Sequence, residues 1–309
     1  MVTRRTFLAG AIAAARVVRG RVTTAQPSPT RLILLGTGGG PRPRTASSAA
    51  AQVIVSNGLA YVVDCGDGVA RQLVFAGVPL TTLRHIFITH HHSDHNADYG
   101  NLVLLAWTAG LSTRVDTWGP PPLENMTKLF FEMNGSDISA RTSNERRTPL
   151  PPLIHPHELR SGGAVWSADN LKVTASPVDH EPGLASFAYR FDARDRSIVI
   201  SGDTARSDKV VALARGADVL VHSAYLDGPA VDRLAARVTN AARLKASILT
   251  YQTSAEDAGR VAQSAGVKTL VLSHLIPADD PQVTDRMWIA AAQSTFRGTV
   301  ILGKDLLEI

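Results

Sequence analysis

The stretch IFITHHHSDH, residues 86–95, decides how this sequence is interpreted. It begins with β-branched and aromatic residues, which are typical of a strand. The next six residues contain His90, His92, Asp94 and His95, four donors of the kind that suit Zn²⁺. In an extended chain His90 and His92 lie on the same side, and His91 faces away. The stretch therefore predicts a metal site at a strand end, with Asp94 and His95 placed past a turn.

Three more candidate ligands follow predicted strands in the second half of the chain. They are His180, after the strand at 171–176, Asp203 in SGDT (201–204), and His274 in LSH (272–274). A lone histidine is more often structural, but four donors within six residues are hard to explain that way. We expect a metal site at one edge of the predicted sheets.

The pattern from residue 31 onward is short β-rich runs punctuated by glycine and alternating with helical segments. Two β-rich halves that carry helices predict an α/β fold of αββα type, with two mixed sheets packed face to face and helices outside. We expect a single domain over residues 26–309. Its proline-rich region, 118–156, contains one helix-like segment at 123–133 and is expected to stay out of the sheets. It is either a lid or loop over one edge or an inert surface excursion.

The N-terminus has the features of an export signal. Arg4 and Arg5 precede an apolar run at 9–15, and small residues at 23–25 come before a polar start. This arrangement resembles a twin-arginine signal over residues 1–25, and the alternative is a basic leader. The run is too short to span a bilayer. We predict a periplasmic or secreted protein without stable membrane association.

The net charge depends on this N-terminal segment. Five of the 32 basic residues lie in the first 25 positions, which leaves 27 basic residues against 27 acidic ones. A neutral body has no global electrostatic preference for polyanions, although a local basic patch is invisible to this count. The single cysteine, Cys65, cannot form an internal disulfide and is expected to be buried.

These elements together resemble the metallo-β-lactamase-fold hydrolases, whose signature is His-x-His-x-Asp-His. The resemblance covers residues 31–303. It includes a glycine-rich opening, GTGGG at 36–40, and a strand-end aspartate, Asp64. After the signature come His180, Asp203 and His274 in the order of the family. The resemblance implies a metal-dependent hydrolase.

The resemblance also assigns ligands to two metal ions. One ion would be bound by His90, His92 and His180, the other by Asp94, His95 and His274, with Asp203 bridging the two. Zinc is expected, with manganese or iron(II) as alternatives. Two close cations lower the pKa of a shared water, so a metal-bound hydroxide would be the nucleophile. Asp94 would orient a proton of this water, and the alternative is a purely structural ligand.

Other residues are expected around the ligands. Asp64 would hydrogen-bond a ligand or a loop amide, because imidazoles that bind metal need their second nitrogen fixed. Thr89, Ser273 and His222 are candidates for similar contacts, each with an ordinary structural role as the alternative. The expected pocket residues are Tyr225 and Gln252.

The sequence is similar to the branch that contains ribonuclease Z and arylsulfatase-type enzymes. It departs from ribonuclease Z at Gln252, where those enzymes have a histidine, and in the run His222-Ser223-Ala224-Tyr225, where they have His-Glu-Ala-Thr. The 22 residues between His180 and Asp203 leave no room for the RNA-gripping arm of those enzymes.

We therefore expect an arylsulfatase-like or phosphodiesterase-like enzyme that cleaves a small sulfate or phosphate ester, with no nucleic-acid partner. The enzymatic alternative is a lactonase or β-lactam hydrolase. The alternative of another class is a non-catalytic zinc-binding protein. The oligomeric state stays open, with a homodimer as one alternative.

Overall fold

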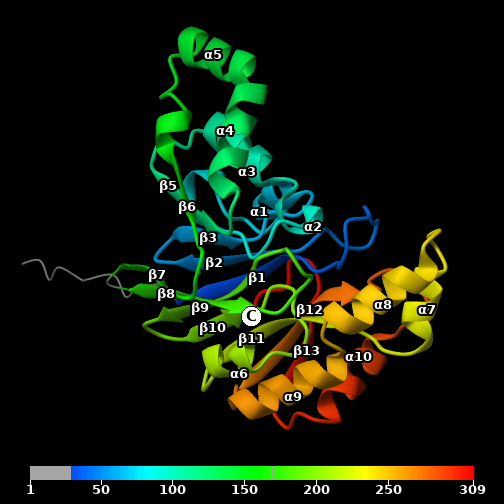
Figure 1. Cartoon of the computed structure of the whole chain (residues 1–309). Coiled ribbons are helices and arrows are strands. Elements are labelled where there is room, and N and C mark those ends of the chain that lie inside the picture. The colour runs from blue at the N-terminus through cyan, green and yellow to red at the C-terminus, as the bar shows by residue number, and fades with distance from the viewer. Residues whose placement is uncertain (1–28, 169) are drawn as a thin grey trace, which may run out of the picture.

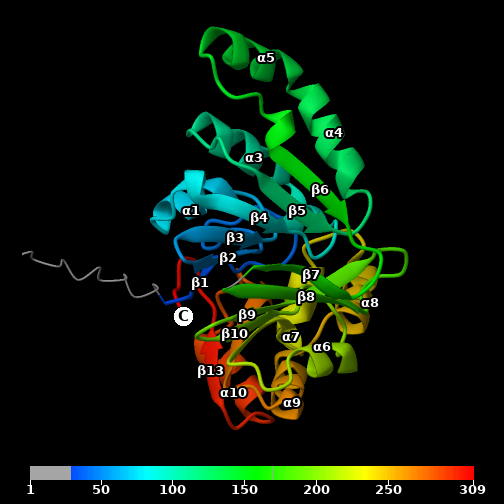
Figure 2. The same cartoon turned by 90° about the vertical axis from the view of Figure 1, so that its left-hand side faces the viewer.

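The computed structural model describes residues 29–168 and 170–309, so the predicted export signal lies outside the described residues. The described chain forms two β-sheets packed face to face, with helices on both outer faces (Figures 1 and 2). This arrangement confirms the expected αββα sandwich of the α/β class.

The first sheet has six strands in the order β1-β2-β3-β4-β5-β6. The strands β1 to β3 pair antiparallel, and β3 to β6 pair parallel. Their bounds are β1 Arg31–Gly36, β2 Ala51–Ser56, β3 Leu59–Val63, β4 Leu83–Phe87, β5 Val115–Gly119 and β6 Ile154–Glu158.

The second sheet has seven strands in the order β13-β12-β11-β10-β9-β8-β7. The strands β10 to β13 pair parallel, and β7 to β10 pair antiparallel, so this sheet is also mixed. Their bounds are β7 Gly163–Ala168, β8 Leu171–Val178, β9 Ser186–Ala193, β10 Ser197–Ile200, β11 Val219–Tyr225, β12 Thr269–Ile276 and β13 Thr299–Leu302.

Helices cover the outer face of each sheet (Figure 2). On the side of the first sheet the helices are α1 Val69–Phe75, α2 Ser93–Asn96, α3 Tyr99–Thr108, α4 Leu123–Met133 and α5 Gly135–Asn144, with short 3₁₀ turns at Leu80–Thr82 and Pro151–Leu153. Of these, α5 lies away from the sheet, at the tip of a projection (Figure 2). On the second they are α6 Asp208–Leu213, α7 Pro229–Ala235, α8 Ala241–Tyr251, α9 Ala255–Ala265 and α10 Asp285–Gln293. Within the described part of the chain, no helix has the length and apolar character needed to cross a bilayer.

The strand β1 shows how the sequence builds the layers. Leu32 and Leu34 are fully buried against the second sheet, whereas Ile33 and Leu35 are buried under the helices of the first sheet. Alternate side chains of a strand point to opposite faces, so an almost continuous apolar run is needed where both faces are covered.

The proline-rich region differs from the expectation. Its ends belong to the first sheet as β5 and β6, and the helices α4 and α5 between them project from the rest of the molecule (Figure 1). Pro156 lies in β6, the edge strand of the sheet, and edge strands are the positions at which a sheet tolerates proline. Phe130 of α4 packs on Gly100 of α3, which anchors the base of this projection.

Candidate metal centre

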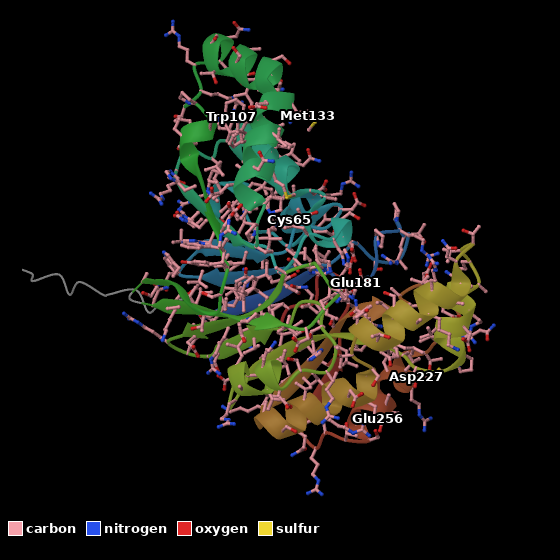
Figure 3. All side chains as sticks on the ribbon, viewed as in Figure 1. Cys65, Trp107, Met133, Glu181, Asp227 and Glu256 are labelled. Carbon is pink, nitrogen blue, oxygen red and sulfur yellow. The ribbon has the colours of Figure 1, made fainter. Side chains whose placement is uncertain are left out.

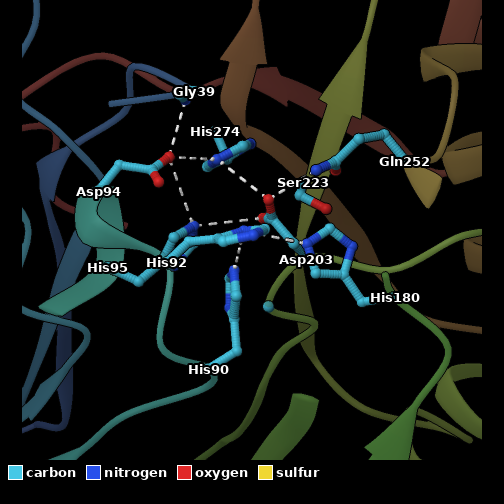
Figure 4. A network of polar contacts seen from close by, with 12 residues as sticks. Gly39, His90, His92, Asp94, His95, His180, Asp203, Ser223, Gln252 and His274 are labelled. Carbon is cyan, nitrogen blue, oxygen red and sulfur yellow. Dashed lines mark hydrogen bonds and ion pairs between the residues drawn. The ribbon is translucent and has the colours of Figure 1, made fainter. Parts of the chain in front are cut away.

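The loops that follow β4, β8 and β10 meet a bulge of β12 at one edge of the sandwich. The loop after β4 crosses to the second sheet, where the Phe187 N–H donates to the Thr89 carbonyl oxygen over 2.9 Å and the Tyr189 hydroxyl donates to the Ile88 carbonyl oxygen over 2.9 Å. The two sheets are thereby joined beside the candidate ligands. Figure 4 shows the group that results, which consists of His90, His92, Asp94, His95, His180, Asp203 and His274.

Three imidazoles form the first half of this group. The Nε2 atom of His90 lies 3.0 Å from Nδ1 of His92, and Nε2 of His180 lies 3.3 Å from the same nitrogen. His90 is fully buried, and the other two are half-buried. This is the spacing at which three nitrogens can bind one cation.

Two histidines and two carboxylates form the second half. Nε2 of His274 lies 3.1 Å from Oδ2 of Asp94 and 3.2 Å from Oδ2 of Asp203. Nε2 of His95 lies 3.5 Å from Oδ1 of Asp203. Asp203 also groups with His90 and His95. Its carboxylate therefore stands between the two halves, in the position of a bridging ligand.

The chemistry of these residues fits two cations. Nε2 of His95 and Oδ1 of Asp203 are buried without a hydrogen-bond partner among the described residues, although buried polar atoms are normally satisfied. Burial lowers the pKa of the His90 and His180 imidazoles, so both rings keep a lone pair at neutral pH. Burial opposes charge on His95 too, but the carboxylates of Asp203, Asp64 and Asp94 outweigh it and raise the pKa of His95. This pocket therefore attracts positive charge.

The Asp64 carboxylate contacts two candidate ligands from the side away from the pocket. It accepts hydrogen bonds from the Thr89 N–H over 2.8 Å and from the Thr89 hydroxyl over 2.9 Å. It also lies 2.7 Å from Nδ1 of His95. The Thr89 oxygen lies 3.0 Å from Nδ1 of His90. One buried carboxylate therefore fixes the orientation of two imidazoles and leaves Nε2 of each ring for a cation.

Two backbone irregularities place side chains in the group. Asp64 follows β3 with a φ of 60°, and His274 has a φ of 47°. The pairing of β12 with β11 skips His274, which therefore forms a bulge. Left-handed backbone is costly for residues other than glycine, and such residues are concentrated at functional sites. Bulges re-aim side chains, and here the bulge turns His274 toward Asp94.

The remaining predicted residues lie in different places. His91 faces away, with Nε2 2.7 Å from the Pro120 carbonyl oxygen. His222 is fully buried, and its Nδ1 lies 2.7 Å from the carbonyl oxygen of Ser223. Ser273 lines a small cavity of about 20 Å³ behind the ligands. The expectation that Tyr225 lines the substrate pocket was wrong, because its ring packs into an apolar cluster under α7 and α8.

Gln252 lies in the pocket and touches the group directly. Its Nε2 donates to Oδ2 of Asp203 over 2.7 Å, so the amide restrains the carboxylate that stands between the two halves (Figure 4). Asp94 is restrained in a similar way, because the Gly40 N–H donates to its Oδ2 over 2.8 Å. The glycine-rich opening is therefore a part of the site.

A pocket of about 360 Å³ opens above the group, and most of its walls were not predicted. Three features of the sequence could have indicated these walls. They are the two arginines after the glycine-rich opening, the glutamate after His180, and the apolar residues of a helical segment. Figure 3 places Glu181 near the boundary between the part of the molecule built on the first sheet and the part built on the second. The unpredicted walls include Arg42, Arg44, Glu181, Leu234, Val238, Leu244, Ser247, Ile248 and Tyr251.

A two-sheet sandwich that gathers histidines and aspartates into two adjoining cation-binding groups defines a metal-dependent hydrolase of the metallo-β-lactamase fold. The chain belongs to the beta-lactamase superfamily, in its ribonuclease Z-like branch. The family described as "Beta-lactamase superfamily domain" matches residues 60–275. The expected superfamily, branch and hydrolase class are thereby confirmed.

Several relatives of the chain are named Ribonuclease Z. The chain is 31% identical over 281 residues to Ribonuclease Z of Mycobacterium bovis (strain BCG / Pasteur 1173P2), covering 90% of this chain and 97% of the relative. It is 33% identical over 279 residues to Ribonuclease Z of Mycobacterium sp. (strain KMS), covering 89% and 94%. The solved structure of human tRNase Z, short form, has a TM-score of 0.66 at 22% identity and covers 90% and 98%. The structure of YhfI from Bacillus subtilis has a TM-score of 0.66 at 19% identity and covers 92% and 99%.

These relatives overturn the expectation of a small sulfate or phosphate ester as the substrate, and with it the expectation of no nucleic-acid partner. Proteins named Ribonuclease Z match about nine-tenths of the chain. The expectation rested on the departures at Gln252 and at residues 222–225, on the short stretch between His180 and Asp203, and on a neutral net charge. The net charge cannot detect the two arginines that line the pocket, Arg42 and Arg44.

Proposed function

We propose that this protein is a zinc-dependent ribonuclease that hydrolyses a phosphodiester bond of RNA, with a precursor of transfer RNA as the first substrate to test. The observation that carries the proposal is the similarity to proteins named Ribonuclease Z over 90% of the chain. The convergence of seven donors at one edge of the sandwich supports it, because this donor set suits two zinc ions.

The side chains would divide the work as follows. His90, His92 and His180 would hold one cation, and Asp94, His95 and His274 the other, with Asp203 shared. Two bound cations supply a water of lowered pKa and neutralise charge on the phosphate. Asp94 lines the pocket, and the Gly40 N–H fixes one of its oxygens. Its carboxylate is therefore placed to hold the proton of the attacking water and to orient that water toward phosphorus.

Departure of the leaving group differs from the pattern of the resembled enzymes. Gln252 stands where they have a histidine, and its amide carries no proton that it can give up at neutral pH. Gln252 instead donates a hydrogen bond to Asp203. We infer that solvent protonates the leaving oxygen and that Gln252 acts as a positioning residue.

The test is RNA cleavage by the zinc-loaded protein. A precursor transfer RNA and a single-stranded RNA with the same 3′ segment are incubated with it, and the cleavage position is mapped by gel electrophoresis. The expected result is cleavage at a defined phosphodiester, which is lost in Asp203→Ala and retained in His91→Ala after identical purification. Protein that contains two zinc ions and leaves both RNAs intact would overturn the proposal.

A further inference from the structure

The pocket above the metal centre has two walls of different chemistry. The helices α7 and α8 supply an apolar wall, formed by Leu234 and Val238 from α7 and the turn after it, and by Leu244, Ile248 and Tyr251 of α8. Val238 is 38% exposed, so apolar surface reaches the rim. An apolar wall beside a charged centre serves a ligand that has an apolar face next to its reacting group.

The glycine-rich loop supplies the opposite, cationic wall. Arg44 is half-buried, and its guanidinium donates to the carbonyl oxygens of Gly39 and Gly40, the latter over 2.9 Å. Arg42 is exposed at the same loop. The two guanidinium groups therefore stand on the loop whose Gly40 N–H holds Asp94. A phosphate that follows the reacting phosphate would find positive charge there.

The Glu181 carboxylate makes the two sides of the pocket differ in charge. Glu181 accepts a hydrogen bond from the Ser247 hydroxyl of α8 over 2.8 Å and lies 3.4 Å from Nε2 of His92. It therefore belongs to the side of the α8 helix, where it repels anions. The phosphate groups of a bound ligand are directed to the arginine side, and an uncharged ring remains for the α7–α8 side.

The size of the pocket limits what it can take. Its volume of about 360 Å³ is near the lower end of the range for small-molecule sites, about 300–1,000 Å³. The chain between His180 and Asp203 forms mainly the strand pair β9 and β10 and contains no separate arm that could hold a folded RNA. This stretch therefore supplies no recognition surface, and the contacts argued for the substrate are those of the pocket itself.

We propose that the pocket binds one unpaired nucleotide next to the scissile phosphodiester, with its base against Tyr251 and the aliphatic wall and its phosphate at Arg42 and Arg44. This inference rests on the proposed ribonuclease function and adds the substrate class, which is a single-stranded RNA segment recognised without a folded body. Base stacking on aromatic side chains tolerates different sequences, so selectivity would be for an unpaired base and not for one particular base.

The first experiment measures binding of a fluorescein-labelled, short single-stranded oligoribonucleotide by anisotropy, with the metal chelated so that no cleavage occurs. Abasic nucleotides replace the normal ones singly around the cleavage position. The wild-type protein is expected to lose about tenfold in affinity at one position, or about 1.4 kcal/mol. Tyr251→Ala is expected to bind the normal RNA about tenfold more weakly and to be insensitive to the abasic site.

The second experiment tests the cationic wall. Arg42→Ala is expected to reduce the slope of log affinity against log salt concentration by about 0.7, the value for one phosphate contact in single-stranded RNA. The matched control is Arg71→Ala on α1, an exposed arginine outside the pocket, which should leave the slope unchanged. Zinc content and circular dichroism show whether each variant is folded.

The control for Tyr251→Ala is Tyr251→Phe. It keeps an aromatic ring and should bind the RNA with wild-type affinity.

The outcomes separate the two proposals. Cleavage of neither RNA by the zinc-loaded protein overturns the ribonuclease function. If RNA is cleaved but Tyr251→Ala and the wild type respond equally to every abasic site, the nucleotide pocket is overturned and the ribonuclease function stands. Binding of a precursor transfer RNA far more tightly than the single strand with the same end would also overturn the pocket as the main recognition element.

Discussion

Replacement of Asp64 by asparagine tests how the metal centre is held. The Asp64 carboxylate is 2% exposed and accepts from the Thr89 N–H, the Thr89 hydroxyl and Nδ1 of His95. Asparagine has nearly the same shape but presents an NH₂ group in place of one oxygen. With its oxygen on the Thr89 N–H, the new NH₂ faces His95, whose Nδ1 then has to accept. The ring proton moves to Nε2, the atom that faces Asp203 and Asp94.

The expected effect is a large loss of metal affinity with the fold intact. A ring protonated at Nε2 has no lone pair there, and changes to partners of ligating histidines cost about 10–100-fold in affinity. Because Asp64 also fixes His90 through Thr89, we expect about 100-fold, or about 2.8 kcal/mol. Zinc affinity is measured by competition with a chromophoric chelator, and the number of bound ions by native mass spectrometry.

The control is Asp98→Asn. Asp98 also accepts a backbone N–H, that of Gly68 over 2.7 Å, but it contacts none of the candidate ligands in the described structure. Its replacement should leave zinc affinity unchanged. Wild-type affinity and two bound ions in Asp64→Asn would refute the argument that Asp64 sets the proton position on His95.

Four further outcomes are expected. Chelation should lower the Tm in calorimetry and added zinc should restore it, since a cation at 100 times its Kd adds about 2.7 kcal/mol. Gly100→Ala should cost about 1–2 kcal/mol in urea unfolding because the new methyl group overlaps the Phe130 ring, and adding Phe130→Ala should recover part of this loss. Hydrogen bonds from Lys268 and Ser197 lower the pKa of Asp218 to about 2, so its stabilisation is present above about pH 4 and is lost as the pH falls toward 2. Asp218→Asn should therefore lower the free energy of unfolding at pH 7 and have a much smaller effect at pH 2. His91→Ala should leave the zinc content unchanged in elemental analysis.

The layers and the ligand group could be predicted because the sequence expresses them locally. Strand period, glycine positions and helix caps are short-range signals, as in α9, where the Ser254 hydroxyl accepts from the Asp257 N–H and Gly266 ends the helix. The candidate ligands could be found because each lies after a strand or, for His274, near the end of one, and parallel strands end at a common edge.

The pocket and the substrate class could not be predicted in the same way. Tyr225 and Tyr251 both lie near the site in sequence, but which of them borders the pocket depends on how α7 and α8 pack. The net charge of zero gave no sign of the two arginines on the glycine-rich loop, because a sum of charges does not show where they lie. The presence of Pro156 in a strand could not be predicted without the strand order, which makes β6 an edge strand. The export signal and the periplasmic or secreted location stay predictions.

The candidate ligands come from both sheets, and this has a kinetic consequence. His90, His92 and His95 follow β4, whereas His180 and Asp203 follow strands of the second sheet and His274 lies in the bulge of β12. Cations bound by ligands from both sheets would connect the two sheets. Any opening that separates the sheets would release the cations. The rate of zinc escape into excess chelator would then report how often the sheets part, a motion that amide exchange in either sheet alone would miss.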